Sequence, residues 1–532
     1  MKTLDNPLTR HFQSLDDIRY ISLKKLFKKT VEELTVANNC IKQFLLCEQA
    51  SDVLEYLIVF CKNIIRMGFS EVFPGVEEEL ATLYDAEENV NRILAEAVAS
   101  IRSESIDLGS RTLFIDKFEN ASDDEESTLA LEKYQSLINT FLDGNTDPYV
   151  VLKNLVSGTK RDKALEEKLK EWLKNTEYNF QRLFLYIKEY QFKQAINMGF
   201  ESPLDYIERK YTVNRAAVKV MEQSFLSIKK DYTDTMSSID DGFSEHLTYA
   251  VILSQPLSFE EAMALLQECF GTISEAFGNM IKQACEEKWI DWENRRNKLH
   301  GYYTNTIHYN GKSLICLEYN GTLECFCKLA HELGHAYHGW LLQSKSYFEY
   351  DFSVITAETF GLFCERYAYL FLVKKGLVNE TVIGDAFKKW VSDIYRSIST
   401  NYLSFSFEKS IFSSLAHKKS VSVSGQFADC QNKICITPIN ELSCYEWIFR
   451  SQNFFPDYYY YNFVYVLGEV VSLSLIDRLI NAQLQFCDIE QMLKNSGIYP
   501  VHDLFEQVGI DLDNPLTFQV NRMVLDIRQN MM

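Results

Sequence analysis

The chain has 532 residues, of which 46% are hydrophobic and 24% are charged, as in an ordinary water-soluble globular protein. Its formal net charge of −20 argues against a nucleic-acid-binding protein, because such proteins carry basic patches that contact phosphates. With only nine prolines and 21 glycines, the chain favours long uninterrupted helices, arranged in two or more domains or in one large multi-lobed body.

The N-terminal residues, MKTLDNPLTRHF, contain no apolar core of a secretory signal peptide. The most apolar later run, residues 462–476, is too short to span a hydrocarbon layer of ~30 Å and contains Glu469, so it predicts a buried helix. The 13 cysteines lack the spacing of a small disulfide framework. We therefore expect reduced thiols, a cytoplasmic location and no membrane partner.

Amphipathic helices are predicted over most of the N-terminal part of the chain. Residues 15–105 repeat apolar positions at three- and four-residue spacing, which marks one buried helix face. The acidic stretch 119–128 lacks large apolar residues and predicts a solvated loop. Residues 163–200 form one long proline-free amphipathic segment, and Gly199 with Pro203 predicts its end and the start of another helix.

The pattern changes to that of strands in residues 299–323. This stretch is rich in β-branched and aromatic residues and is punctuated by Asn310-Gly311 and Asn320-Gly321, two turn signals. The sequence therefore predicts a small sheet directly before the next motif.

That motif is HELGHAYHGW, residues 331–340. On a helix, His331 and His335 share a face and can both bind one metal ion, while Glu332 lies about 100° round the helix and can reach a water on the metal. The alternative is a helix that simply carries two histidines. His338 fits either a partly exposed helix residue or a substrate contact.

A catalytic zinc site needs a third protein ligand and one open position. Residues 353–376 predict a second helix, and Glu358 lies near its start among apolar residues, where an unpaired carboxylate would be costly. Cys327 shares a helix face with the histidines, and Cys325 and Cys364 are near in sequence. A site with two histidines and one cysteine therefore stays open, although a hydrolytic zinc more often takes a carboxylate.

The motifs LAHELGHAYH and TAET, with Glu358 at this separation, resemble those of the thimet oligopeptidase and oligoendopeptidase F group of zinc peptidases. Residues 286–304 resemble the tract that enters the small sheet of this family, and residues 314–335 resemble its edge strand followed by the metal helix. The likeness covers roughly residues 165–530, and the metal motif is its specific part.

The resemblance implies a mainly α fold, a two-lobed helical clamshell with a deep central channel and a small β-sheet next to the zinc-binding helix. It divides the chain into an N-terminal helical region, residues 1–160, and a helical zinc peptidase catalytic region, residues 161–532. Such a channel admits short unstructured oligopeptides and excludes folded proteins. The strand around Leu314–Asn320 is then expected to pair with the substrate backbone.

Carried over residue by residue, the resemblance implies one zinc ion per chain with His331, His335 and Glu358 as its ligands. Glu332 would be the general base, and a water on the zinc would be the nucleophile that hydrolyses oligopeptides. The expected partners are oligopeptide substrates, and neither nucleic acids nor membranes.

The aromatic segment 451–468 departs from the family, which has a histidine and tyrosines there that bind the oxyanion. Placing Tyr465 on the later family tyrosine puts Tyr458 on an earlier one and Asn453 in place of the histidine. An asparagine can donate a hydrogen bond but carries no charge. We expect Tyr465, with Tyr458 or Asn453, to hold the oxyanion, although packing of an aromatic helix face would also explain the tyrosine run.

Two other functions stay open. The chain could be a peptide-binding or scaffold protein of the same fold with little or no turnover, which the missing histidine favours. It could also be a zinc carboxypeptidase, which the position of cleavage would distinguish from an endopeptidase. The retained Glu332 favours an enzyme.

Overall fold

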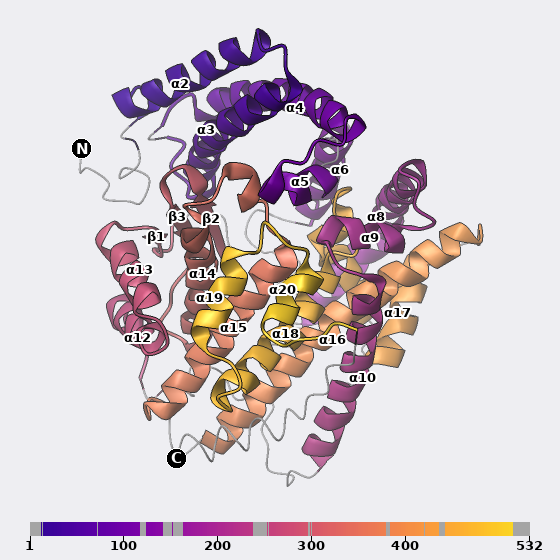
Figure 1. Ribbon diagram of the computed structural model, residues 1–532. Helices are drawn as coiled ribbons and strands as arrows, with labels where there is room; N and C mark the ends of the chain where they lie inside the picture. The colour runs from indigo at the N-terminus through magenta and orange to yellow at the C-terminus, as the bar shows by residue number, and fades with distance from the viewer. Residues whose placement is uncertain are drawn as a thin grey trace.

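A computed structural model of the protein describes residues 12–513, apart from residues 13, 72, 118–123, 142–151, 153–162, 238–252, 254, 296–297, 299–300, 379–382, 420 and 436–441. Helices make up most of the described chain, and one small sheet lies beside the central helices (Figure 1). The mainly α architecture predicted from the sequence is confirmed.

The α-helices, in chain order, are α2 (Ile18–Thr35), α3 (Cys40–Arg66), α4 (Val76–Ser103), α5 (Thr112–Lys117), α6 (Asp124–Asn139), α8 (Lys163–Asn197), α9 (Pro203–Tyr211), α10 (Arg215–Ser237), α12 (Phe259–Gly271), α13 (Glu275–Glu286), α14 (Leu323–Leu342), α15 (Val354–Lys374), α16 (Ile383–Ala416), α17 (Val423–Ile434), α18 (Asn462–Ile480), α19 (Phe486–Lys494) and α20 (Val501–Gln507). The 3₁₀ turns are η1 (Gly109–Arg111), η2 (His308–Asn310), η3 (Tyr347–Tyr350), η5 (Ser443–Phe449) and η6 (Ser451–Phe454). The strands are β1 (Ile290–Asp291), β2 (Tyr303–Ile307) and β3 (Lys312–Cys316).

Local sequence explains where these helices begin and end. The long amphipathic segment is α8, and after it Gly199 has a φ of +88°, a left-handed conformation that glycine adopts without a steric penalty. Ser202 then caps α9 through its side chain, with Pro203 in the first turn, where a proline costs no hydrogen bond. The predicted break at this point is confirmed.

The predicted acidic loop is only partly a loop. Residues 124–128 belong to α6, so the prediction is wrong for them, while residues 119–123 lie outside the described part of the chain. Glutamates favour a helix, and acidic residues in its first turn complement the helix dipole, so the charge that suggested a loop is compatible with a helix start.

The small sheet has the order β1-β3-β2. Strands β2 and β3 form the predicted antiparallel hairpin, which turns through η2 and Gly311 at a φ of +64°. β3 is the central strand, because it also pairs in parallel with β1. The expectation that a substrate pairs with the strand around Leu314–Asn320 is therefore wrong for Ile315 and Cys316, where β1 and β2 occupy both edges of β3, and it stays a prediction for residues 317–320.

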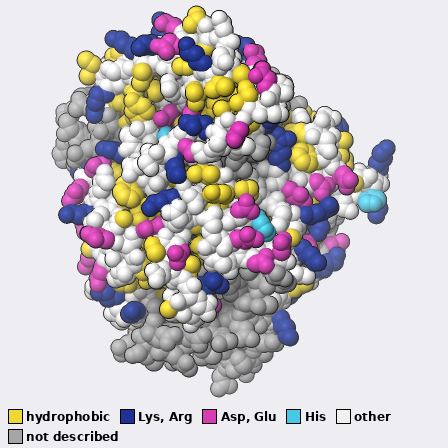
Figure 2. Space-filling model, in the orientation of Figure 1, with side chains coloured by type: hydrophobic (Ala, Val, Ile, Leu, Met, Phe, Trp, Pro, Cys, Tyr) yellow, Lys and Arg dark blue, Asp and Glu magenta, His cyan; other side chains and the backbone are white. Residues whose placement is uncertain are grey.

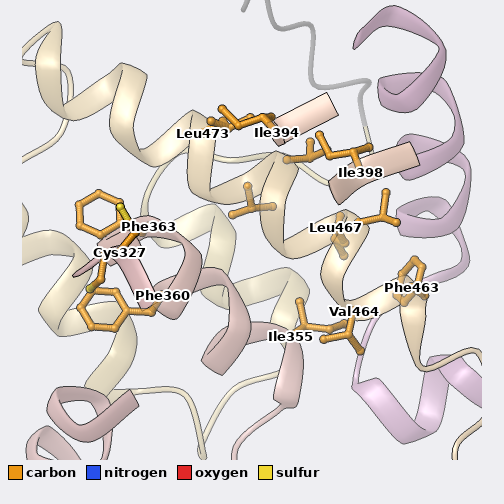
Figure 3. Close-up of a cluster of buried hydrophobic side chains, with 14 of the residues drawn as sticks. Cys327, Ile355, Phe360, Phe363, Ile394, Ile398, Phe463, Val464, Leu467 and Leu473 are labelled. Carbon is orange, nitrogen blue, oxygen red and sulfur yellow. The ribbon is translucent and has the colours of Figure 1, made fainter. Parts of the chain in front are cut away.

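The core behind the sheet is formed by α14, α15 and α18, and α15 packs against both of the others. The predicted buried helix of residues 462–476 is α18, which is apolar around most of its circumference, as a helix enclosed by other elements must be. Figure 3 shows this core, where Ile355 of α15 lies near Val464 of α18, and Phe360 and Phe363 of α15 lie near Cys327 of α14. Within the described residues, no helix has the length and apolar character needed to cross a membrane.

Helices α2–α5, the first four of the described chain, form hydrophobic clusters separate from the main core. Buried side chains of α2–α5 make two clusters, and the main cluster begins at Ala130. These clusters reach the rest of the protein where Ile307, Leu314 and Cys316 of the hairpin pack on α3, and where Phe348 of η3 packs near α5. The division of the chain at residue 160 stays a prediction.

On the face of the molecule shown in Figure 2, acidic and basic side chains are interspersed.

Candidate metal site

Helix α14 carries the two histidines of the motif. The Thr322 side chain caps its start by accepting a hydrogen bond from the backbone N–H of Cys325. The Nε2 atoms of His331 and His335 lie 3.0 Å apart, one helical turn from each other. The two rings therefore point to one place, as the four-residue spacing predicts.

Glu358 comes from the neighbouring helix α15, and its Oε2 lies 3.4 Å from His331 Nε2. Potential ligand atoms of His331, His335 and Glu358 all lie within 4.8 Å of one another, and no cysteine belongs to a metal-binding group among the described residues. Cys325 instead donates to the carbonyl oxygen of Glu318. The alternative of two histidines and one cysteine therefore has no support in the geometry.

Two glycines allow α14 and α15 to approach this closely. A Cβ at Gly361 would lie 2.8 Å from His331 Nε2, and a Cβ at Gly334 would lie 2.9 Å from Cys364 Sγ. Real Cβ contacts are not this short, so alanine at either position would force the two helices or their side chains apart. The glycines thus permit the meeting of the three candidate ligands.

The electrostatics of Glu358 and His335 fit a divalent metal ion. Burial opposes charge on Glu358, yet hydrogen bonding from His331 and the nearby His335 hold the pKa of its carboxyl below the ordinary value. Burial also lowers the pKa of His335, which keeps that ring neutral. A buried carboxylate beside two imidazoles is a donor set that zinc uses at catalytic sites.

Glu332 is buried beside this group without belonging to it. Its Oε2 accepts a hydrogen bond of 2.7 Å from Thr304 Oγ1, on strand β2. Sequence reasoning missed Thr304. The predicted strand could have pointed to Thr304, because side chains alternate along a strand and every second residue faces helix α14.

Glu365 is a second residue that sequence reasoning missed. Its Oε2 lies 3.4 Å from His331 Nδ1, and its carboxylate also contacts Lys328 at 2.9 Å and Arg366 at 3.1 Å. Burial alone would raise the pKa of Glu365, but the charges of Lys328 and Arg366 outweigh it and hold the pKa well below its ordinary value. The sequence could have pointed to Glu365, because it lies seven residues after Glu358, about two helical turns, and therefore on the same helix face.

Arg366 extends this network to α18. Its guanidinium binds Glu469 twice, with bonds of 2.7 Å and 2.9 Å, and the Glu469 side chain is fully buried. Such a bidentate pair fixes geometry as well as charge. The network therefore ties α18 to the helix that carries Glu358.

Tyrosines of the aromatic segment approach the group from α18 and from the turn before it. The Tyr465 hydroxyl donates to Glu358 Oε1 over 3.3 Å, and the Tyr461 hydroxyl lies 3.2 Å from that of Tyr465. The ring of Tyr458 stacks on that of Tyr461, with centroids 4.4 Å apart. Burial, and then the charge of Glu358, raise the pKa of Tyr465, so it remains a hydrogen-bond donor. Sequence reasoning did not single out Tyr461.

Two other polar residues of the sequence analysis have different places. Asn453 is buried, and its side-chain amide donates to the carbonyl oxygen of Trp447, 2.9 Å away. His338 is also buried rather than partly exposed, and its Nε2 lies 2.8 Å from Ser496 Oγ. Neither residue belongs to the metal-binding group.

Comparisons with known proteins agree with this geometry. Residues 272–522 match the model of Peptidase family M3. The chromosomal oligoendopeptidase F of Lactococcus lactis subsp. cremoris is 29% identical over 107 residues, which are 20% of this chain and 18% of that protein. The group B oligopeptidase PepB of Streptococcus agalactiae is 21% identical over 282 residues, 49% of this chain and 44% of that protein. The chain is therefore matched to less than half the length of each of these relatives.

The fold comparison extends further along the chain. PZ peptidase A, solved with an inhibitor, superposes with a TM-score of 0.73 at 13% identity and covers 96% of this chain and 98% of its own. A likeness at this identity concerns the fold, while the match of residues 272–522 concerns the sequence around the metal helix. The two likenesses agree: residues 272–522 are similar in sequence to Peptidase family M3, with distant relatives of the oligoendopeptidase F type, and nearly the whole chain is similar in fold to PZ peptidase A.

Proposed function

We propose that the protein is a zinc-dependent metalloendopeptidase that hydrolyses short unstructured oligopeptides. The observation that carries this proposal is the group of His331, His335 and Glu358, of which His331 is buried and the other two are partly buried, with Glu332 beside it, outside the ligand set and held by Thr304. A catalytic site needs this combination of ligands and a separate carboxylate, whereas a purely structural zinc site has four protein ligands.

His331, His335 and Glu358 would hold the ion. When bound, zinc supplies a Lewis acid that polarises the scissile carbonyl and activates water for attack. Glu332 takes the proton of the attacking water and passes it to the leaving amine. Thr304 holds the carboxylate in place for both transfers.

The Tyr465 hydroxyl is hydrogen-bonded to the candidate metal ligand Glu358, so it lies close to the place of the substrate carbonyl. It donates its hydrogen to the oxyanion that develops on that carbonyl. Tyr458 supports the arrangement by stacking on Tyr461. Asn453 is left out of this role, since it is buried and its amide is held by the carbonyl oxygen of Trp447.

Substrate selection follows from the proposed clamshell with its N-terminal helical region, residues 1–160, and catalytic region, residues 161–532. The separate clusters of α2–α5, which cover the hairpin, support such a division. Strand β2 is an edge strand of the described sheet and carries Thr304, so an extended peptide is expected to pair with β2 rather than with β3.

Mass spectrometry of a mixed-peptide digest tests the proposal. The zinc-loaded protein should cleave internal bonds of short peptides, leave folded proteins intact and stop when a chelator is added. Glu332→Gln at equal zinc occupancy is the matched control, because the amide oxygen still accepts from Thr304, and its turnover should fall by about 10²–10⁴.

Other outcomes identify the alternatives. Equal rates for the wild type and Glu332→Gln would assign the activity to a contaminant or another site. Peptide binding without cleavage would indicate a binding or scaffold protein, and removal of single C-terminal residues would indicate a zinc carboxypeptidase.

A further inference from the structure

The hydroxyls of Tyr461 and Tyr465 form a chain that ends on the candidate ligand Glu358. The Tyr465 hydroxyl donates to Glu358 Oε1, and a phenol has a single hydrogen to donate. The contact of 3.2 Å between the two hydroxyls must therefore use the hydrogen of Tyr461 and a lone pair of Tyr465. Tyr461 therefore donates to Tyr465, and Tyr465 donates to Glu358.

We propose, on the basis of the proposed function, that Tyr461 is a positioning residue that acts through Tyr465. A hydroxyl that accepts one hydrogen bond becomes a stronger donor of its own hydrogen, because the two bonds polarise each other. As charge develops on the substrate carbonyl, Tyr465 turns its hydrogen from Glu358 to the oxyanion. Tyr461 continues to donate to the Tyr465 oxygen, so the donor keeps both its orientation and its strength.

The surroundings hold Tyr461 in this position. Its ring stacks on Tyr458 with an angle of 12° between the planes. The backbone turn that precedes it is held from α8, where Gln191 Nε2 donates to the carbonyl oxygens of Pro456, at 2.8 Å, and Tyr458, at 3.1 Å. The Tyr211 hydroxyl donates to the carbonyl oxygen of Tyr459 at 2.9 Å.

This support comes from outside the region that matches the family model, since α8 and α9 precede residue 272. Gln191 is itself fixed by Lys188 Nζ, 2.9 Å from its Oε1, and Lys188 forms a buried ion pair with Glu408. Helices α8 and α9 therefore contribute to the site by placing the turn that carries Tyr461.

Tyr461→Phe tests the proposal, because it removes the hydroxyl and keeps the stacked ring. Two quantities are measured on zinc-loaded protein: peptide hydrolysis, and the affinity for a phosphinic peptide, whose tetrahedral oxygens imitate the transition state. Both kcat and this affinity should fall about five- to tenfold, the size of one neutral hydrogen bond, while KM stays within about twofold. Tyr460→Phe is the matched control and should change neither, since the Tyr460 ring packs on Phe405 and Phe412.

A double-mutant cycle distinguishes action through Tyr465 from direct action on the substrate. In the Tyr465→Phe background, Tyr461→Phe should change the affinity for the phosphinic peptide by less than about twofold, because the residue it acts through is gone. A full effect in that background would overturn the proposal. So would unchanged kcat and affinity for Tyr461→Phe in an otherwise active protein.

The proposed function fails in a different way. A zinc-loaded wild type that neither cleaves peptides nor binds the phosphinic peptide would overturn the proposed function, and this inference with it.

Discussion

Glu365→Gln removes one negative charge from the buried network that joins α14, α15 and α18. The wild-type network balances Lys328 and Arg366 against Glu365 and Glu469. The variant leaves two cations and one anion in the interior, although glutamine has nearly the shape of glutamate. It should therefore lower both the stability of the fold and the affinity for zinc.

The magnitude of the first effect follows from burial. Removing one partner of a buried ion pair costs about 3–5 kcal/mol, because the other charge stays unpaired in the interior. The Lys328 side chain is 36% exposed and can turn to water, and Arg366 keeps Glu469 as its partner, so the loss should lie near the lower end. We expect a decrease of about 3 kcal/mol in the free energy of unfolding.

The second effect concerns His331, whose Nδ1 lies 3.4 Å from the Glu365 carboxylate. Loss of a partner that orients a metal ligand weakens metal binding roughly 10- to 100-fold, or about 1.4–2.8 kcal/mol. Urea unfolding in the presence of a chelator measures stability without a metal contribution, and competition with a chromophoric chelator measures the zinc affinity.

A double variant separates the two effects. Lys328→Met with Glu365→Gln restores the charge balance, so it should recover part of the stability but none of the zinc affinity. Glu324→Gln, an exposed change in the first turn of α14, is the matched control: it should leave the zinc affinity unaltered and lower the unfolding free energy by no more than the ~0.3–1 kcal/mol of a lost helix-dipole interaction. The reasoning is refuted if Glu365→Gln has the wild-type unfolding free energy and the wild-type zinc affinity.

Elemental analysis of the purified protein should find close to one zinc per chain. The His335→Ala variant should lose this zinc but keep most of its helical signal in far-UV circular dichroism. A wild type that cannot be loaded with zinc would contradict the ligand assignment. Thr304→Val removes the hydroxyl that donates to the general base, so kcat should fall about tenfold or more at unchanged zinc content, and an unchanged kcat would exclude a role for this bond. Burial opposes the protonation of His308, but its hydrogen bond to Asp52 and the charge of that carboxylate outweigh it and raise the pKa. A raised pKa stabilises the fold fully below the unfolded value of about 6.5, and this contribution is lost as the pH rises through the folded pKa. The difference in unfolding free energy between wild type and His308→Gln should therefore be larger at pH 6 than at pH 9, and an equal difference at the two pH values would contradict this assignment.

Regular helical spacing made much of the site predictable from the sequence. Residues four apart share a helix face whatever else the chain does, so the spacing of His331 and His335 is enough to pair them. Glu358 could be chosen because a lone carboxylate among apolar residues needs a partner. The choice of a carboxylate over the cysteines followed from the chemistry of zinc, and the geometry of the described residues agrees with it.

Contacts between distant segments were not predictable in this way. Thr304 meets Glu332 only because the hairpin packs across α14, and Glu365 meets His331 only because Gly334 and Gly361 let two helices approach. Neither contact leaves a periodic signal in one segment.

By itself, the sequence determined several of the helices, the hairpin and the three candidate metal ligands, because these depend on residue spacing within one or two neighbouring elements. Only the tertiary structure decided which strand has a free edge, that Asn453 is engaged with Trp447, and that Tyr461 donates to Tyr465. These facts depend on how segments far apart in the chain are oriented against each other. Packing of side chains throughout the core sets that orientation, and no local pattern records it.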